Sequence, residues 1–161
     1  MSNVTLLVTF ASLFDFMKAD AKFSTAIHIC LYLQYRGEKL LSSQEMAASV
    51  GTNPVVIRRV LAELRKKNIV GSVAGNQGGF YLTRPVGKIN LWDIYQAVND
   101  RELFQRPKVN EECPVSSNLG QLVKLPFQAA ENAMQPGLEK ITVSDLYGQL
   151  EDLLKTSPKF C

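Results

Sequence analysis

Apolar residues recur with the 3.6-residue period of an α-helix in two neighbouring segments of the chain. These positions are Met46, Ala47 and Val50 within residues 41–50, and Ile57, Val60, Leu61 and Leu64 within residues 55–68. Ser42 or Ser43 can cap the first helix, while Asn53 can cap the second. Pro54 suits the first turn of the second helix, where no N–H partner is needed. The pattern predicts two helices joined by a tight turn, the arrangement of a helix-turn-helix.

The second helix is basic on the side that faces away from its apolar stripe. That side carries Val55, Arg59, Ala62 and Lys66, with Arg58 and Arg65 at its edge. A basic, outward-facing second helix can enter the major groove of DNA. The alternative is an ordinary α+β domain with a hydrated basic surface, because a charge run alone often means no more than that.

Two short segments rich in β-branched and aromatic residues follow, at residues 69–73 and 80–84, and predict a pair of strands. Between them, residues 74–79 read AGNQGG. Glycine allows the positive φ angles of a tight turn, and its lack of a side chain lets the backbone approach a phosphate closely. A helix-turn-helix followed by such a hairpin is a winged helix-turn-helix.

The remaining sequence predicts helices around one loop. Asn90 can cap a helix over residues 91–98, residues 99–117 form a loop, and residues 118–134 form a longer helix that ends at Pro136-Gly137. Pro126 should kink this helix or divide it in two. A terminal helix starts near Val143, with Leu146, Leu150, Leu153 and Leu154 as its apolar positions. The domain is too small to cover the longer helix, so its apolar stripe is most simply buried on a second copy of the chain.

The basic charge is concentrated in the first part of the chain. The net charge is only +3, but residues 1–100 hold eleven Lys or Arg against seven Asp or Glu, whereas residues 101–161 hold seven against eight. Positive charge at this site would neutralise phosphates and release counterions, so binding to DNA should weaken steeply with salt. Hydrophobic residues make up 46% of the chain, which is enough for a real core.

No targeting or membrane-spanning segment is expected. No uninterrupted apolar run reaches about 18 residues. Residues 4–14 are apolar, but they follow no basic region and precede no small-residue cleavage site, so they do not form a signal peptide. We expect a cytoplasmic protein. The first 16 residues form an N-terminal extension, which is either an added element or the product of an upstream start codon.

The motifs of the chain resemble those of the Rrf2 family of bacterial transcription regulators. They are LSSQEMA (residues 41–47), NP (53–54), VLAELRKK (60–67), VAGNQGGFYLTRP (73–85) and INLWDIYQAV (89–98), with MK (17–18) and FSTAIHICLYL (23–33) ahead of them. The resemblance covers most of the chain from residue 17 onward. It implies a homodimeric DNA-binding regulator, usually a repressor, whose long helix forms the dimer interface.

The expected fold is mainly α with a small β-hairpin wing. Residues 17–100 form a winged helix-turn-helix DNA-binding domain, and residues 101–161 form a loop and dimerisation helices. The expected partner is double-stranded DNA with a palindromic operator. The candidate DNA-binding residues are Ser42, Ser43, Thr52, Asn53, Pro54, Val55, Arg58, Arg59, Lys66, Gly75, Asn76, Gln77 and Gly78.

The cysteines argue against an iron–sulfur cluster. Many Rrf2 regulators hold a cluster with three closely spaced cysteines in the loop that corresponds to residues 99–117, and this chain has only Cys113 there. Cys30 lies on an apolar helix face, and Cys161 is the last residue. We expect no metal and no cofactor, because a cluster would need ligands from a partner subunit or from His28. The Cys-Pro-Val segment at 113–115 resembles cluster-free members of the family.

Cys113 has two possible roles, and the sequence does not distinguish between them. It is either a small hydrophobic anchor for the loop or a redox sensor whose thiol is activated by the following helix. Glu111 and Glu112 oppose such activation, because negative charge raises the pKa of a thiol. The regulator could therefore respond to thiol oxidation, to a small effector or to a regulatory protein.

No pattern of an enzyme is found. The chain has one histidine, no metal-site spacing and no Gly-x-Ser-x-Gly, and the glycines at 75–79 lie between strands, the wrong context for a nucleotide-binding loop. The remaining alternative is a protein-interaction module that has kept the fold without binding DNA. Two departures from the family favour it: Ala74 stands where an arginine often precedes the wing glycine, and Val56 replaces a common aromatic residue.

Overall fold

The computed structural model describes residues 10–75, 77–99 and 109–156, with side chains described from residue 21 onward. Six α-helices, one 3-10 helix and two strands are found in these ranges. In chain order they are α1 (Phe10–Tyr35), α2 (Ser43–Val50), α3 (Pro54–Lys66), β1 (Val70–Val73), β2 (Gly79–Leu82), η1 (Val86–Lys88), α4 (Leu91–Val98), α5 (Pro114–Glu139) and α6 (Val143–Thr156). The predicted class, mainly helical with a small hairpin, is confirmed. Helix α1 runs across the expected start of the DNA-binding domain at residue 17.

Short-range capping sets the limits of α2 and α3. The Ser42 side chain accepts a hydrogen bond from the Glu45 N–H, and the Glu45 side chain accepts one from the Ser42 N–H, which is a capping box. Gly51 ends α2 in the left-handed conformation, at φ 74°. The Asn53 side chain then accepts a hydrogen bond from the Val55 N–H, and Pro54 opens α3. Both predicted helices and their caps are therefore confirmed.

The wing is a two-stranded antiparallel hairpin anchored to the connection between α1 and α2. Val70 pairs with Leu82 and Val73 with Gly79, and an isolated bridge joins Leu41 to Phe80. A Cβ on Gly79 would lie 2.9 Å from the backbone N and O of Leu41. Only glycine lets the strand approach this closely, so the sequence at this position fixes the base of the wing.

One hydrophobic core unites α1, α2, α3, β1, α4 and the start of α6. Its largest fully buried side chains are Ile29, Leu41, Met46, Ile57, Leu61, Leu64, Ile69, Ile89, Ile94, Val60, Val70 and Val98. The apolar stripe predicted for α3 is entirely within this core. Burying each such side chain contributes about 1.5–3 kcal/mol, which is what holds the small domain together.

Helix α5 differs from the prediction at both ends. It starts at Pro114, four residues before the predicted 118, because proline at the first position lacks only an N–H that has no partner there. Pro126 does not divide it, and it continues through Pro136 to Glu139. The φ of proline is compatible with a helix, and Leu138 packs against the core just beyond Pro136. The predicted end at Pro136-Gly137 was therefore wrong.

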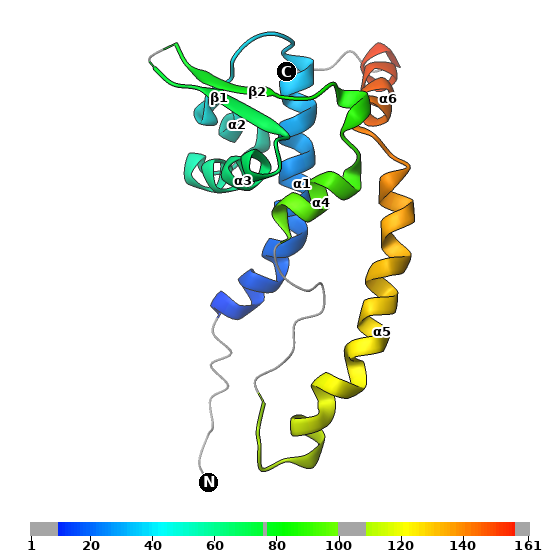
Figure 1. The fold of residues 1–161 in the computed structure, drawn as a ribbon. Coiled ribbons are helices and arrows are strands. Elements are labelled where there is room, and N and C mark those ends of the chain that lie inside the picture. Colours follow the sequence, from blue (N-terminus) through cyan, green and yellow to red (C-terminus); the bar gives the residue numbers. More distant parts are fainter. Residues whose placement is uncertain (1–9, 76, 100–108, 157–161) are drawn as a thin grey trace.

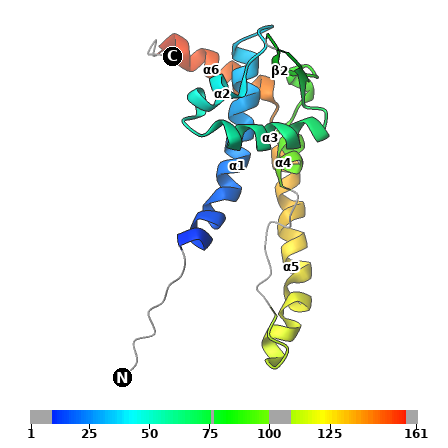
Figure 2. The same ribbon diagram turned by 90° about the vertical axis from the view of Figure 1, so that its left-hand side faces the viewer.

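Helices α5 and α6 differ in how closely they are attached to the winged domain. Helix α6 is tied to the domain: Val143 is buried, and its N–H donates to the Ile89 carbonyl at 2.9 Å. Helix α5 has no buried residue and extends away from the winged domain in both views (Figures 1 and 2). Within the described part of the chain, no helix combines the length and apolar character needed to cross a membrane.

Candidate nucleic-acid interface

Helix α3 presents a basic surface on the side that the core leaves uncovered. Arg58, Arg59, Arg65 and Lys66 are all exposed there, whereas the stripe on the other side is buried. Lys66 pairs with Glu63 at 2.9 Å near the end of the helix. Arg58 and Arg59 are the basic residues nearest its start. In Figure 2 the helix runs across the domain next to α2. Such a surface has the charge and shape to meet a major groove.

The start of α2 lies close to this surface and adds hydroxyl and backbone donors. Arg58 Nη1 donates to Ser43 Oγ at 3.4 Å, which brings the two helices together at one point. Ser42 is the residue that caps α2. Its hydroxyl and its backbone N–H both bind Glu45 Oε2, at 3.0 and 2.9 Å, so its polar groups serve the capping box. Of the two serines, only Ser43 lies beside an arginine of α3.

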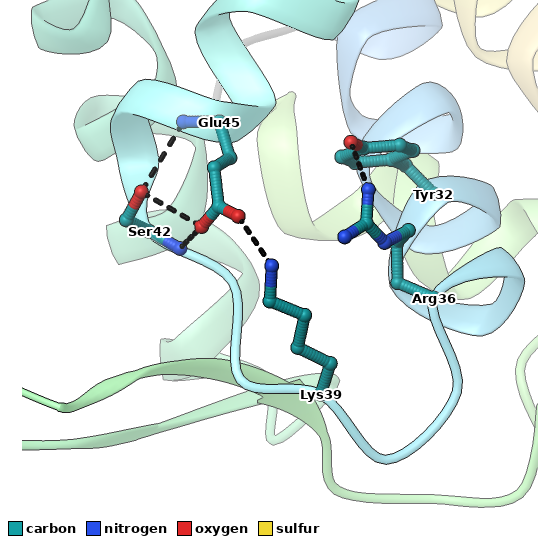
Figure 3. A network of polar contacts seen from close by, with 5 residues as sticks. All are labelled: Tyr32, Arg36, Lys39, Ser42 and Glu45. Carbon is teal, nitrogen blue, oxygen red and sulfur yellow. Dashed lines mark hydrogen bonds and ion pairs between the residues drawn. The ribbon is translucent and has the colours of Figure 1, made fainter. Parts of the chain in front are cut away.

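A polar network that the sequence analysis missed holds this part of the structure (Figure 3). Lys39 Nζ donates to Glu45 Oε1 at 2.8 Å, while Ser42 binds the other oxygen of the same carboxylate. The hydrogen bond from Lys39, followed by those from Ser42, lowers the pKa of Glu45 to about 2. The signal for it was visible, because Ser42 and Glu45 have the spacing of a capping box.

Helix α1 ends beside this network. Arg36 Nη1 donates to the Tyr32 hydroxyl at 3.3 Å, and the guanidinium lies 5.8 Å from the centre of the Tyr32 ring. Figure 3 shows this pair where α1 ends, ahead of Lys39 and the capping box. The Arg36–Tyr32 pair closes the end of α1, and the separate hydrogen bond from Lys39 to Glu45 ties the connecting segment to the start of α2.

The turn residues of the helix pair have mainly backbone roles. The Thr52 N–H donates to the Ala47 carbonyl at 2.9 Å and closes the end of α2. Asn53 Oδ1 accepts the Val55 N–H at 2.8 Å, so its amide nitrogen is the part that remains to face outward. Val55 and its neighbour Val56 are exposed at 46% and 42% at the first turn of α3.

The tip of the wing requires glycine for a steric reason. The Gly78 N–H donates to the Gly75 carbonyl at 3.0 Å, and Gly75 has a φ of 111°. A Cβ on Gly78 would lie 2.2 Å from the Val73 carbonyl oxygen, which is backbone and cannot move aside. Gln77 is exposed at this tip, and the predicted contact residue Asn76 lies outside the described residues.

The candidate sensor lies far along the chain from this surface. Cys113 is half-buried at the start of α5, where its carbonyl accepts the Ser117 N–H at 3.0 Å. Cys30 is in the core, as expected, and burial raises the pKa of its thiol to about 12 although Arg84 acts in the opposite direction. His28 is half-buried, with Nε2 2.9 Å from Ser49 Oγ, and burial lowers its pKa.

A cavity at the base of the wing was not foreseen. It has a volume of about 590 Å³ and lies between the end of α1, the connection to α2, and residues 81–86. Glu38, Tyr81 and Arg84 line it together with apolar side chains. Arg84 also pairs with Asp93 of α4 at 3.5 Å, and its buried Nε has no partner among the described residues. The residues that line the cavity come from separate segments, so no local sequence pattern could predict it.

Known proteins resemble this chain over most of its length. The family model Rrf2, described as an iron-dependent transcriptional regulator, matches residues 19–149. YwnA of Bacillus subtilis, assigned as an HTH-type transcriptional regulator, is 35% identical over 133 residues, which cover 81% of this chain and 98% of YwnA.

Solved structures of similar fold also include transcriptional regulators. A protein of Lactobacillus plantarum assigned as a transcriptional regulator has a TM-score of 0.67 at 27% identity, over 81% of this chain and 89% of its own. CymR, the global cysteine regulator of B. subtilis, has a TM-score of 0.58 at 21% identity, over 80% and 94%. The latter shows the fold alone. Together these relatives are transcriptional regulators and not enzymes.

The donor groups of this chain do not fit a cysteine-bound iron centre. Among the described residues, no three His, Cys, Asp or Glu side chains lie close enough to hold a metal ion. Of the three cysteines in the sequence, Cys30 is a core residue whose thiol stays protonated, and Cys113 stands alone at the start of α5. Clusters need several thiolates within reach of one another, and the described residues bring no such set together.

Proposed function

The chain belongs to the Rrf2 family of transcriptional regulators, and from this we propose that it binds a palindromic operator as a homodimer and acts as a repressor. The observation that supports this best is the exposed basic side of α3, joined to the start of α2 through Arg58 and Ser43 at 3.4 Å. Residues 17–100 would bind DNA, and residues 101–161 would join two copies. A cytoplasmic location follows from such a role.

Contacts with DNA divide into two kinds in this proposal. Arg59 and Val55 would reach base edges in the major groove, with Asn53 beside them, because they lie at the start of the second helix. Arg58 and Ser43 would hold one phosphate, where a guanidinium and a hydroxyl meet. Thr52, Pro54 and Ser42 would act by shaping the turn and the cap, and Lys66 would approach the backbone at the far end of α3.

The wing would add a second contact outside the major groove. Its tip, at Gly75, Asn76, Gln77 and Gly78, combines small residues with amide side chains that can bind phosphates or the minor groove. The wing base is fixed through Gly79 against Leu41, so the tip would be presented at a constant place relative to α3.

A second copy of the chain would cover α5. Val115, Leu122 and Leu125 are exposed at 67%, 68% and 74%, and their spacing of seven and three residues places them on one side of the helix. An uncovered apolar stripe on a long helix is typical of a subunit interface. A twofold pair would also place two copies of α3 at successive turns of a palindrome.

Two inputs are candidates for regulation. Cys113 lies half-buried at the start of α5, where oxidation would change the region that joins the dimer. The cavity at the wing base could instead admit a small effector beside the strand β2. If the input is a thiol oxidant, peroxide will lower DNA affinity in the wild type and not in Cys113→Ser. Equal responses in both proteins would favour an effector or a regulatory protein.

Binding to DNA is tested by gel shift on the region upstream of the protein's own gene, over a range of salt. We expect a shift on a short palindrome that weakens steeply between low and physiological salt. Absence of binding even at low salt would favour the alternative, a protein-interaction module of the same fold. Ala74 and Val56 are the departures from the family that support this alternative.

A footprint repeated with oxidant and with reductant then locates the operator and its input. We expect the protein purified without oxygen to be colourless, because Cys113 is the only cysteine in residues 99–117, where the family's cluster ligands fall. Stoichiometric iron and sulfide in that preparation would contradict this expectation.

A further inference from the structure

Two adjacent valines at the first turn of α3 lie outside the hydrophobic core. Val55 is exposed at 46% and Val56 at 42%, whereas the other aliphatic residues of the helix that carry its stripe are buried. Burial of a valine side chain is favourable, so leaving two of them in water forgoes that gain. The pair forms a small apolar patch at the end of α3 that a recognition helix places deepest in the groove.

Two polar groups lie near this patch: the Asn53 amide just ahead of it, of which only the nitrogen remains free to face outward, and Arg59 one turn further along the helix. Asn53 Oδ1 accepts the Val55 N–H at 2.8 Å, and Pro54 has no N–H to offer. Arg59 is exposed one turn after Val55 on the same side of the helix. It forms no ion pair with any residue in the described part of the chain. The leading end of α3 therefore offers methyl groups first and a guanidinium second.

Base edges in the major groove differ in what they offer to such a surface. Thymine alone presents a methyl group, at C5, and guanine presents the two acceptors O6 and N7 that suit an arginine. We infer that Val55 and Val56 select thymine through its methyl group, and that Arg59 reads a guanine nearby. This inference rests on the proposed function and names the class of half-site that it would recognise.

Helix geometry limits the distance between the two bases. Val55 and Arg59 are four residues apart, which is about 6 Å along a helix that rises ~1.5 Å per residue. Base pairs are stacked about 3.4 Å apart along one strand. The guanine therefore lies about one or two base pairs from the thymine, with Arg59's longer side chain accounting for the range.

A valine side chain has no hydrogen-bonding group, and this disfavours other bases at the same place. Cytosine carries only hydrogen at C5, where thymine has its methyl, and adenine presents its N7 acceptor and its amino donor to the major groove. A valine side chain would remove water from these groups without providing a hydrogen bond, which costs free energy. Selection would come from the methyl contact and from this penalty together.

Replacement of thymine by deoxyuridine tests the inference, because it removes only the methyl group. The full chain is used to select binding sites from a pool of random duplexes, and each thymine of the recovered half-site is then replaced in turn. We expect one or two positions where uracil lowers wild-type affinity about fourfold, the effect of one buried methyl-sized group. In Val55→Ala or Val56→Ala, the loss at one of these positions should fall to within about twofold.

A matched control separates this effect from a general loss of exposed valine. Val109 is exposed at 63% outside α3, so Val109→Ala should keep the full sensitivity to uracil. Alanine favours helix, and circular dichroism will show that α3 variants remain folded. Equal affinity for thymine and uracil at every position, or unchanged sensitivity in both α3 variants, would overturn the inference. If no sequence is enriched at all, the proposed function itself fails, which is a distinct result.

Discussion

Helices α3 and α5 are both amphipathic, but only α3 buries its apolar stripe within the chain. The stripe of α3 consists of Ile57, Val60, Leu61 and Leu64, all in the core, whereas that of α5 includes Val115, Leu122 and Leu125, all exposed. The sequence pattern of the two helices is similar, and their surroundings are different. A stripe covered within the chain stabilises the domain, and an uncovered one requires a partner.

The remaining surfaces of the two helices also have different roles. Helix α3 carries exposed arginines that suit phosphates, and α5 ends near Leu138, whose contact with the core joins it to the domain. The fold thus separates one surface for DNA from another for a second subunit. Substitutions in the two helices should therefore affect different measurements.

The largest effect is expected in the core of the winged domain. Leu64→Ala should lower the free energy of unfolding by about 2–5 kcal/mol, because it removes buried methyl groups and leaves a cavity. Urea denaturation with circular dichroism measures this. Leu125→Ala serves as the control on α5, and at protein concentrations below the dimer range it should change the free energy of unfolding by less than about 0.5 kcal/mol. Similar losses in both variants would remove the distinction between the helices.

The second effect concerns assembly. Leu122→Asp should weaken dimerisation by about 2–4 kcal/mol, because it places a charge in the middle of a stripe that the proposed dimer would remove from water. Sedimentation equilibrium measures the dissociation constant, and the far-ultraviolet circular dichroism should not change. Gln128→Asp adds the same charge about 120° around the helix and is the control. A dimer that is equally stable in both proteins would place the interface elsewhere.

Much of the winged domain follows from local pattern, and much of the second half does not. The helical period, the caps at Ser42, Asn53 and Asn90, and the glycine turn predict their elements because each signal lies within a few residues of what it determines. The limits of α5 were predicted wrongly. Proline predicts a helix end from local cost alone, whereas the packing of Leu138 against distant core residues extends the helix through Pro136.

The candidate site divides in the same way. The exposed arginines of α3 could be predicted from periodicity, since the opposite side of an amphipathic helix faces water. The cavity beside Arg84 could not, because it depends on how residues 33–40 and 81–86, distant in sequence, meet. The ion pair from Lys39 to Glu45 lies within six residues, but it depends on the path of the chain between α1 and α2, which no periodicity gives. The sequence also could not tell which of Ser42 and Ser43 caps α2. In the structure Ser42 is the cap, and the Ser43 hydroxyl accepts a hydrogen bond from Arg58.

The third prediction separates base reading from phosphate binding on α3. Arg59→Ala should weaken binding to the selected operator by about 1–3 kcal/mol and relax the preference at one base pair. Arg58→Ala is the matched control, since it should weaken all sequences alike and reduce the salt dependence. Fluorescence anisotropy on operator and scrambled duplexes measures both. If Arg59→Ala keeps full specific affinity, another side of α3 faces the bases.

The fourth prediction concerns the wing. Gly78→Val should lower DNA affinity by about 1–2 kcal/mol while the dimer stays intact, because a Cβ there collides with the Val73 carbonyl and deforms the tip. Gly87→Val is the control, since nothing lies within 4 Å of a Cβ at Gly87. Affinity and sedimentation are measured on the same samples. Unchanged affinity in Gly78→Val would mean that the wing takes no part in binding.

The smallest effect is a pH dependence that belongs to the winged domain alone. The pKa of Glu45 is lowered from 4.5 to about 2, so its ionised form stabilises the fold above pH 4.5, and this contribution is lost as the pH falls toward 2. The carboxylate is 37% exposed, and solvent screening reduces its contribution to about 0.5–1 kcal/mol. Glu45→Gln should therefore be less stable than the wild type near pH 7, and the difference should shrink below pH 4.5 and nearly vanish as the pH falls to about 2. Glu139→Gln is the control on α5, where the carboxylate accepts a hydrogen bond from Gln135 of the same helix at 2.6 Å. Urea denaturation from pH 2 to pH 7 compares them, and a difference for Glu45→Gln that persists unchanged at pH 2 would show that the charge of Glu45 is not what stabilises the start of α2.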